Sequence, residues 1–261
     1  MTVSVSAPLH WHTEPTLLMG LLVVMLLYGF GVAILRQRLA PGTALPTRRA
    51  VCFALGLVSL YVTVASPLDA IAEHYLFSAH MLQHVILIYP VSMLLLLGLP
   101  GWLLRPLLTF PVLAPCWRWV TKPLVAFLAF NVAFSAWHLP GLYEWALRDR
   151  TVHNVEHMIL LVTSMLMWWP LLSPMREYPC LPPGLQTLYV LALSLGQIPV
   201  FAYLTFSSQV LYPTYETAQR LLPLTPLADQ QLGGMIMKVA SMAVLFGLLA
   251  VAFWRWYHTD S

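Results

Sequence analysis

The chain has 261 residues, of which 59% are hydrophobic and 9% are charged, whereas about a quarter of the residues of an ordinary soluble domain carry a charge. This composition excludes a soluble globular protein and indicates a chain that lies in a lipid bilayer. The formal net charge of +3 is spread over the connections between apolar runs. It forms no basic face, which excludes a partner made of nucleic acid.

Apolar runs of about 20 residues, the length that crosses a hydrocarbon core, occupy nearly the whole chain. No soluble domain or long linker remains between them. We therefore predict an all-α, polytopic membrane protein with seven transmembrane helices that form a single transmembrane domain over residues 1–261. The predicted spans are 16–36, 49–66, 74–98, 123–139, 152–171, 184–206 and 230–256.

Positively charged residues in the connections predict the orientation of these spans. The N-terminal segment lacks the basic stretch and cleavage site of a secretory signal, so the first run is expected to remain as a span. Nine positive residues lie on or beside the first, third and fifth connections and the C-terminus, against Arg148, Arg150 and Arg220 on the other side. By the positive-inside rule the N-terminus is predicted outside and the C-terminus in the cytoplasm.

Six of the nine histidines lie at span ends that this topology assigns to the outer leaflet. Residues four apart on a helix share one face, so two pairs of imidazoles each form a ladder one turn long. Imidazole is the commonest metal ligand in proteins, and polar groups without a role are costly in lipid. The convergence of three spans therefore predicts a metal site. The third span begins with His74, His80 and His84, the fourth ends with His138, and the fifth begins with His153 and His157.

Other residues on the same side are expected to support these ligands. Carboxylates orient imidazoles and neutralise a cation, and methionine thioethers suit Cu(I). The predicted ligands are His80, His84, His153, His157 and, in addition, His138. The predicted supporting positions are Asp69, His74, Gln83, Glu156, Asp229, Met235, Met237 and Lys238.

Two other functions fit these segments poorly. A zinc peptidase requires a glutamate directly after the first histidine, and neither "HMLQH" nor "HNVEH" has one. A channel or pump requires polar groups across the bilayer, but the inner halves of the third and fifth spans hold no ionisable group except a tyrosine. The prediction is a cup open to the outside, widened by a kink at Pro90.

Five motifs together resemble the CtaG-type cytochrome c oxidase assembly factors, which are seven-span bacterial membrane proteins. The motifs are "SPLD" at 66–69, "FSAHMLQH" at 77–84, "WHLPGLYEWAL" at 137–147, "HNVEH" at 153–157 and "DQQLGGMIM" at 229–237. The resemblance implies a non-enzymatic role in maturing a haem-copper oxidase in the bacterial cytoplasmic (inner) membrane, with copper as the ion delivered. It also implies haem-copper oxidase subunits and an extracytoplasmic copper donor as partners. The chain departs from the family at Lys238, where the motif usually continues with tryptophan.

Two alternatives follow from the same residues. Lys238 in the last of seven spans is reminiscent of a retinal protein, but that reading leaves the clustered histidines unused. A haem-binding membrane protein of the respiratory chain is the stronger alternative, because His80 or His84 could face His153 or His157 as axial ligands. The sequence leaves copper and haem both open.

Overall fold

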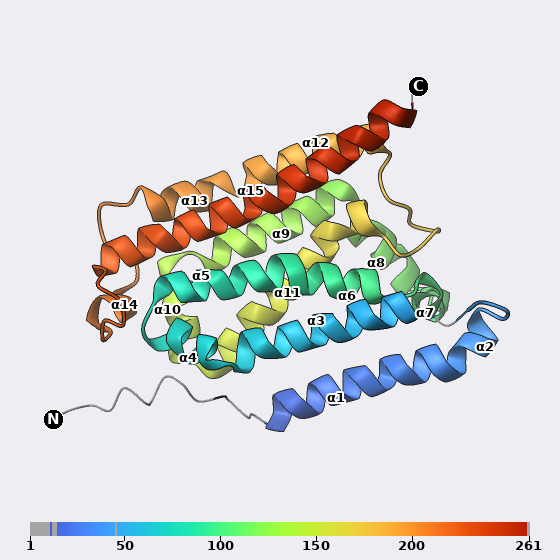
Figure 1. The fold of residues 1–261 in the computed structure, drawn as a ribbon, viewed down its shortest axis with the longest axis horizontal. Coiled ribbons are helices and arrows are strands. Elements are labelled where there is room, and N and C mark those ends of the chain that lie inside the picture. Colours follow the sequence, from blue (N-terminus) through green and yellow to red (C-terminus); the bar gives the residue numbers. More distant parts are fainter. Residues whose placement is uncertain (1–10, 12–14, 45, 260–261) are drawn as a thin grey trace.

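The apolar runs fold into long helices because backbone groups in lipid must find their hydrogen bonds within the same segment. The computed structural model describes residues 11, 15–44 and 46–259, and these contain helices and no strand. The long helices run side by side (Figure 1). The first part of the chain forms α1 (Pro15–Phe30), the π-helical turn η2 (Gly31–Leu35), α2 (Arg36–Leu39), α3 (Thr47–Ala65) and α4 (Pro67–His74).

The middle of the chain contains the two helices that carry the histidine pairs. The first of these helices is α5 (Phe77–Ile86), which continues through the π-helical turn η3 (Leu87–Val91) into α6 (Ser92–Gly98). The second is α11 (Arg150–Leu172). Between them lie α7 (Gly101–Leu104), the 3₁₀ turn η4 (Arg105–Thr109), α8 (Leu113–Val120), α9 (Pro123–Trp137) and α10 (Pro140–Arg148).

The last third of the chain adds a broken span, a short helix and the longest helix. Three of these helices begin with proline, and the remaining one has proline at its second position, just after the break in the span. At the start of a helix the backbone N–H that proline lacks would have no hydrogen-bond partner within the helix. The elements are α12 (Pro183–Gly196), α13 (Ile198–Thr205), α14 (Pro213–Thr217) and α15 (Pro226–Thr259).

The prediction of an all-α, multi-span membrane protein is confirmed. Within the part of the chain that the structure describes, six helical segments are long and apolar enough to cross a membrane, and α8 and α9, which meet at 76°, would make a seventh span if counted together. The predicted third span is too long at its start, because α4 ends at His74 and the spanning helix begins only at Phe77. The orientation of the termini stays a prediction.

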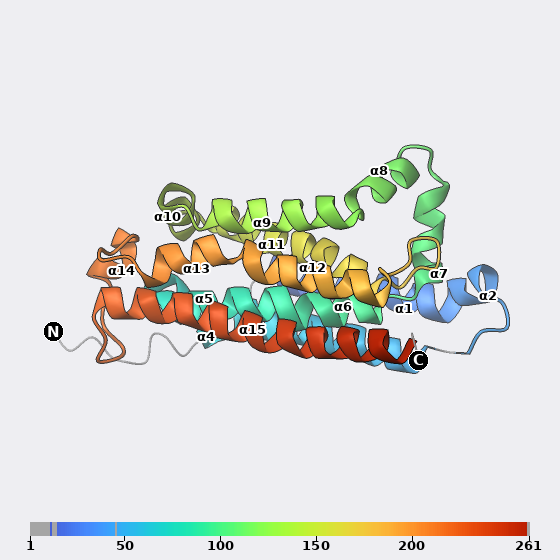
Figure 2. The ribbon, with the colours of Figure 1, turned by 90° about the horizontal axis from the view of Figure 1, so that it is seen from above.

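Short helices gather at the two ends of the bundle. In Figures 1 and 2, α4, α10 and α14 lie at one end, together with the starts of α5, α11 and α15, and α2, α7 and α8 lie at the other. The centre is formed by α5 and α6, which pack against α15 and α3 respectively, and by α11, which packs against α9 and α6. The histidine pairs therefore begin the central helices at one end of the bundle.

Pro90 lies in η3, six residues after the second histidine of the first pair. Proline removes a helical hydrogen bond, and the five residues from Leu87 to Val91 accordingly form a π turn. The carbonyl of Ile88 in this turn accepts a hydrogen bond from Trp168 Nε1 at 2.7 Å. The turn thus ties α5 to α11 below the histidines.

Candidate metal centre

A carboxylate caps the start of each of these two helices: α11 is capped by the exposed residue directly before it, and α5 by a buried residue from a distant part of the chain. Asp149 accepts hydrogen bonds from the backbone N–H groups of the first turn of α11, at 2.8 and 3.2 Å. Asp229, at the start of α15, accepts from Phe77 N at 2.8 Å, Ser78 N at 3.3 Å and Ser78 Oγ at 2.5 Å. A carboxylate at a helix N-terminus satisfies free N–H groups and complements the helix dipole. Asp229 therefore positions α5 rather than touching the imidazoles.

The two imidazole pairs converge in the interior. Nε2 of His80 lies 3.0 Å from Nε2 of His84, and Nε2 of His153 lies 3.1 Å from Nε2 of His157. The rings of His80 and His153 stack across the two helices with centroids 5.2 Å apart. The ring of His138, just after α9, lies 5.5 Å from that of His84. All five predicted ligands are thus brought together.

The separations of the ring nitrogens are those of an N–H···N hydrogen bond, and they also suit one shared metal ion. Two nitrogens that each bind an ion at about 2.0–2.1 Å lie roughly 2.9 to 3.4 Å apart when the angle at the metal is roughly 90–110°. Both pairs fall in this range. Among the described residues, three groups of three have their candidate ligand atoms within 4.8 Å of one another. They are His80, His84 and His157; His80, His153 and Glu156; and Asp69, Glu73 and His153. The cluster therefore fits an ion held by imidazoles from both helices.

The Nδ1 nitrogens of His80 and His153 each face an oxygen atom. The hydroxyl of Tyr215 donates to the carbonyl of Ala72 at 2.6 Å, so its oxygen, 3.3 Å from His80 Nδ1, can only accept from that ring. Nδ1 of His153 lies 2.7 Å from Glu73 Oε1, which also can only accept. The Tyr215 contact places the proton of His80 on Nδ1 and leaves its Nε2 lone pair directed into the cluster. Nδ1 of His153 is at ion-pair distance from Glu73 but makes no hydrogen bond among the described residues.

His138 has the same arrangement as His80. Its Nδ1 is 2.6 Å from the carbonyl oxygen of Phe134, and its buried Nε2 has no hydrogen-bond partner among the described residues. A carbonyl oxygen can only accept, so the proton lies on Nδ1 and Nε2 offers a lone pair. His138 is therefore available as a further ligand.

Glu156 brings a carboxylate to the cluster. Its side chain is fully buried, its Oε1 lies 3.5 Å from His84 Nε2, and neither carboxylate oxygen has a hydrogen-bond partner among the described residues. A buried carboxylate without donors is costly. A cation held by the neighbouring imidazoles would remove that cost.

A second layer of charged residues connects α4 to α11. Glu73 pairs with Arg150, and Asp69 lies 3.1 Å from the same guanidinium. Burial alone would raise the pKa of Glu73, but the contact with His153 and the charge of Arg150 outweigh it and lower the pKa to about 2. Burial and the neighbouring Glu73 raise the pKa of Asp69. Glu73 is thus held as an anion facing His153.

Gln83 anchors this layer to α5. Its Nε2 donates to Asp69 Oδ1 at 2.9 Å and to the carbonyl of Thr63 at 2.8 Å. Gln83 and Asp69 therefore lie beside the cluster and orient its surroundings, without a contact to an imidazole nitrogen among the described residues.

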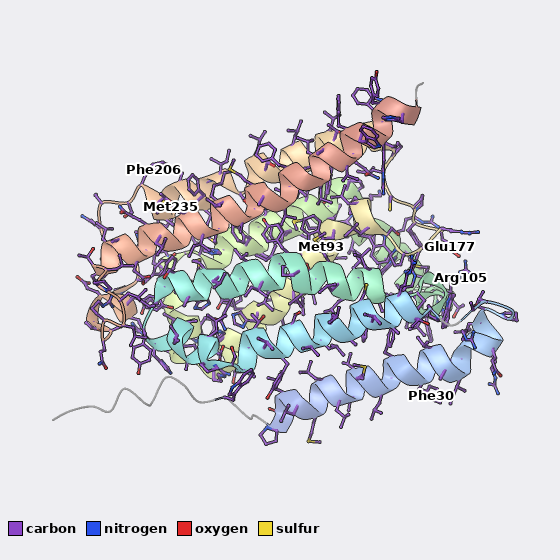
Figure 3. The ribbon with its side chains drawn as sticks, in the orientation of Figure 1. Phe30, Met93, Arg105, Glu177, Phe206 and Met235 are labelled. Carbon is purple, nitrogen blue, oxygen red and sulfur yellow. The ribbon has the colours of Figure 1, made fainter. Side chains whose placement is uncertain are left out.

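Four predicted supporting residues lie apart from the cluster. The side chain of His74 is 63% exposed, and Met235 lies on the outer face of α15 (Figure 3) with 44% of its surface exposed. Met237 is buried beside Lys238 in a small cavity. Lys238 Nζ lies 3.4 Å from the carbonyl of Ser194 and 5.8 Å from the centre of the Phe201 ring. Lys238 forms no ion pair with Asp229 or Glu156 among the described residues, because its stem leads toward α12 and α13.

The expectation of an open cup is wrong. His80, His84, His138 and His153 are at most 1% exposed, because α4, α10 and α14 cover this end of the bundle. His157 is 7% exposed and lines a cavity of about 610 Å³ between α1, α3 and α11, whose other walls are mostly apolar. This cavity is open at the side of the bundle, and we call it the lateral groove. The largely exposed helix α1 forms one of its walls.

The sequence assigned no role to Tyr215 and Glu73, which contact the Nδ1 atoms of His80 and His153. Tyr215 lies in α14, 135 positions after His80, and its hydroxyl is also 3.1 Å from that of Tyr143. No local spacing signals such a contact. Glu73 had a signal in its position beside the SPLD motif, one helical turn after Asp69.

The fold and the cluster define the class: a polytopic membrane protein with a buried site of five imidazoles and one carboxylate. The family model for the cytochrome c oxidase caa3 assembly factor matches residues 26–259, and the chain belongs to this family. The resemblance inferred from the five motifs is confirmed. No curated protein and no solved structure matches the chain.

Proposed function

We propose that this protein binds a copper ion at the histidine cluster and passes it to a haem-copper oxidase during assembly, without catalysing a reaction. Membership of the assembly factor family supports the oxidase as the recipient. The observation that carries the proposal is the pair of Nε2–Nε2 separations of 3.0 and 3.1 Å, with Nδ1 of His80 and of His153 each facing an oxygen atom. Imidazole nitrogens suit copper.

In this proposal His80, His84, His153 and His157 hold the ion, and His138 offers a fifth nitrogen. Tyr215 and Glu73 hold the ring orientations, and Glu156 balances the charge. The cluster would receive copper from an extracytoplasmic donor, in the orientation that the positive-inside rule predicts for a bacterial cytoplasmic membrane.

The ring contacts favour an ion over haem. A macrocycle with axial ligands from α5 and α11 would have to lie between their histidines. The stacked rings of His80 and His153, with centroids 5.2 Å apart, leave no slot of that size. This supports a single metal ion, rather than haem, as the occupant.

The test uses the full chain in detergent, loaded with copper and freed of excess metal. The variant is His80→Ala with His84→Ala, and the matched control is His74→Ala with His258→Ala, which removes two exposed histidines. Elemental analysis should find copper on the wild type and the control, and a loss on the cluster variant. Cells should lose active oxidase with the same variant. Unchanged copper and oxidase in the cluster variant, or a Soret band in the wild type, would contradict the proposal.

A second variant, His80→Gln with His84→Gln, distinguishes the loss of metal ligands from a folding defect. Its unfolding temperature is measured first and should equal that of the wild type. This variant keeps hydrogen-bonding groups in the interior, so a loss of copper from it reports on the ligands. Retained copper in the folded glutamine variant would overturn the assignment.

The groove that His157 lines also offers copper a lateral route from the cluster to the oxidase, and this route has its own test. Gly20 lines the groove, and a Cβ there meets nothing within 4 Å, so Gly20→Phe adds an aromatic side chain at the wall of the groove. Gly29 on the same helix is equally open but does not line the groove, and Gly29→Phe is the control. Copper binding should persist in both variants, while oxidase maturation should fall with Gly20→Phe alone. Normal maturation with Gly20→Phe would exclude this route.

A further inference from the structure

The sequence predicted no basic face, but the fold gathers three of the positively charged connections at the end of the bundle opposite the histidine cluster, which therefore carries an excess of positive charge (Figure 1). The three connections at this end, residues 36–49, 99–123 and 173–183, hold eight lysine and arginine residues and one acid, Glu177. Figure 3 shows Arg105 and Glu177 together at this end, and Arg105 Nε lies 2.6 Å from Glu177 Oε1. The single acid is therefore already paired.

Three of these arginines line one cavity. The cavity has a volume of about 500 Å³ and lies between the connection after α2, the link from α6 to α7 and residues 174–177. Arg49, Arg105 and Arg176 come from three separate segments of the chain. Arg49 is partly buried and donates to the carbonyl of Leu99 at 2.6 Å, which holds its guanidinium at the wall. With Glu177 included, the cavity has a net charge of +2.

We propose that this cavity binds the phosphodiester headgroup of an anionic membrane phospholipid. Guanidinium groups from several directions match the oxygens of a phosphate, and basic pockets between transmembrane helices bind such headgroups. The proposal does not depend on the histidine cluster.

The surroundings of the cavity favour a lipid over a free anion. Trp102 lines the cavity, and tryptophan is enriched at the level of the headgroups. The connection that carries Arg105 continues with exposed apolar side chains, including Phe110 at 57% and Val112 at 77% exposure. Acyl chains provide the medium for such side chains, whereas a free phosphate in water does not. The headgroup would join α2 to the rest of the bundle.

The test measures lipid retention by the full chain with native mass spectrometry. The protein in mild detergent receives equal amounts of phosphatidylglycerol and phosphatidylcholine. The wild type should retain phosphatidylglycerol preferentially, and millimolar inorganic phosphate should not displace it. Equal retention of the two lipids, or displacement by inorganic phosphate, would overturn the proposal.

A matched pair of variants locates the site. Arg49→Gln with Arg176→Gln removes two charges from the cavity, and Arg38→Gln with Arg118→Gln removes two exposed charges at the same end that do not line it. Each basic residue near an anionic lipid surface contributes about 1 kcal/mol, so the cavity variant should lose affinity for phosphatidylglycerol by roughly 30-fold. The control should stay within a few-fold of the wild type. Equal losses in the two variants would show a general surface effect and refute the cavity.

Discussion

The carboxylate of Asp229 connects the start of α15 to the start of α5, and its removal should destabilise the helix that carries the first histidine pair. Asp229→Ala leaves Phe77 N, Ser78 N and Ser78 Oγ without the acceptor that they share. All three residues are at most 5% exposed. Each unsatisfied buried donor costs about 1–3 kcal/mol. With some relaxation of the first turn, the expected loss is about 3–5 kcal/mol.

Thermal unfolding in detergent measures this loss. At about 2–4 °C per kcal/mol for a chain of this size, the unfolding temperature should fall on the order of 10 °C. Asp229→Asn keeps one acceptor oxygen and should lose about half as much. Glu216→Ala is the control, because Glu216 is an exposed acid at the same end. An Asp229→Ala protein that unfolds within about 2 °C of the wild type would refute the capping role.

Three further substitutions test the packing and the surroundings of the cluster. Tyr215→Phe removes the hydroxyl that accepts a hydrogen bond from His80 and should weaken copper binding by roughly 10–100-fold in a competition titration. The control is Tyr189→Phe, which should not change the affinity, because the hydroxyl of Tyr189 donates to the carbonyl of Met167. Equal copper affinities of the two variants would refute the orienting contact. Lys238→Met should keep copper binding and an equal or higher unfolding temperature, because a charge within a span costs about 2.5–3.5 kcal/mol, and copper loss would place Lys238 at the site. Gly98→Ala should lower the unfolding temperature, because its Cβ would lie 2.6 Å from the backbone nitrogen of Phe53, while Gly247→Ala, with nothing within 4 Å, should not; matching behaviour would contradict the close approach of α6 to α3.

Much of this architecture follows from local sequence. Hydropathy alone predicts the long helices, because a spanning segment must be apolar over a fixed length. The spacing of four residues predicts that His80 and His84 share a face, as do His153 and His157. The helical repeat therefore predicts the two histidine pairs that form the centre of the candidate site.

The remainder depends on contacts between distant parts of the chain. The burial of the histidines results from α14 and α10, and no hydropathy pattern indicates that α14 places Tyr215 on His80. Helix ends were also missed, because Tyr75 and Leu76 leave the helical conformation and separate α4 from α5. The direction of the Lys238 stem depends on how α15 packs against α12 and α13, which the sequence of α15 alone does not encode.

The role of Asp229 illustrates the same limit. Its sequence motif and its side of the membrane suggested a residue that neutralises a metal site. The structure instead has its carboxylate on the backbone of Phe77 and Ser78. A short acidic side chain at a helix start suits both roles, and only the packing of α15 against α5 distinguishes them.

X-ray absorption at the copper K-edge tests the central claim most directly. On the copper-loaded full chain, the account predicts three to five nitrogen or oxygen ligands at about 2.0 Å, with the multiple-scattering pattern of imidazole and no sulfur. That signal should be lost in the His80→Ala, His84→Ala variant and kept in the His74→Ala, His258→Ala control. A sulfur ligand at about 2.3 Å, or an unchanged imidazole signal in the cluster variant, would contradict copper binding at these histidines.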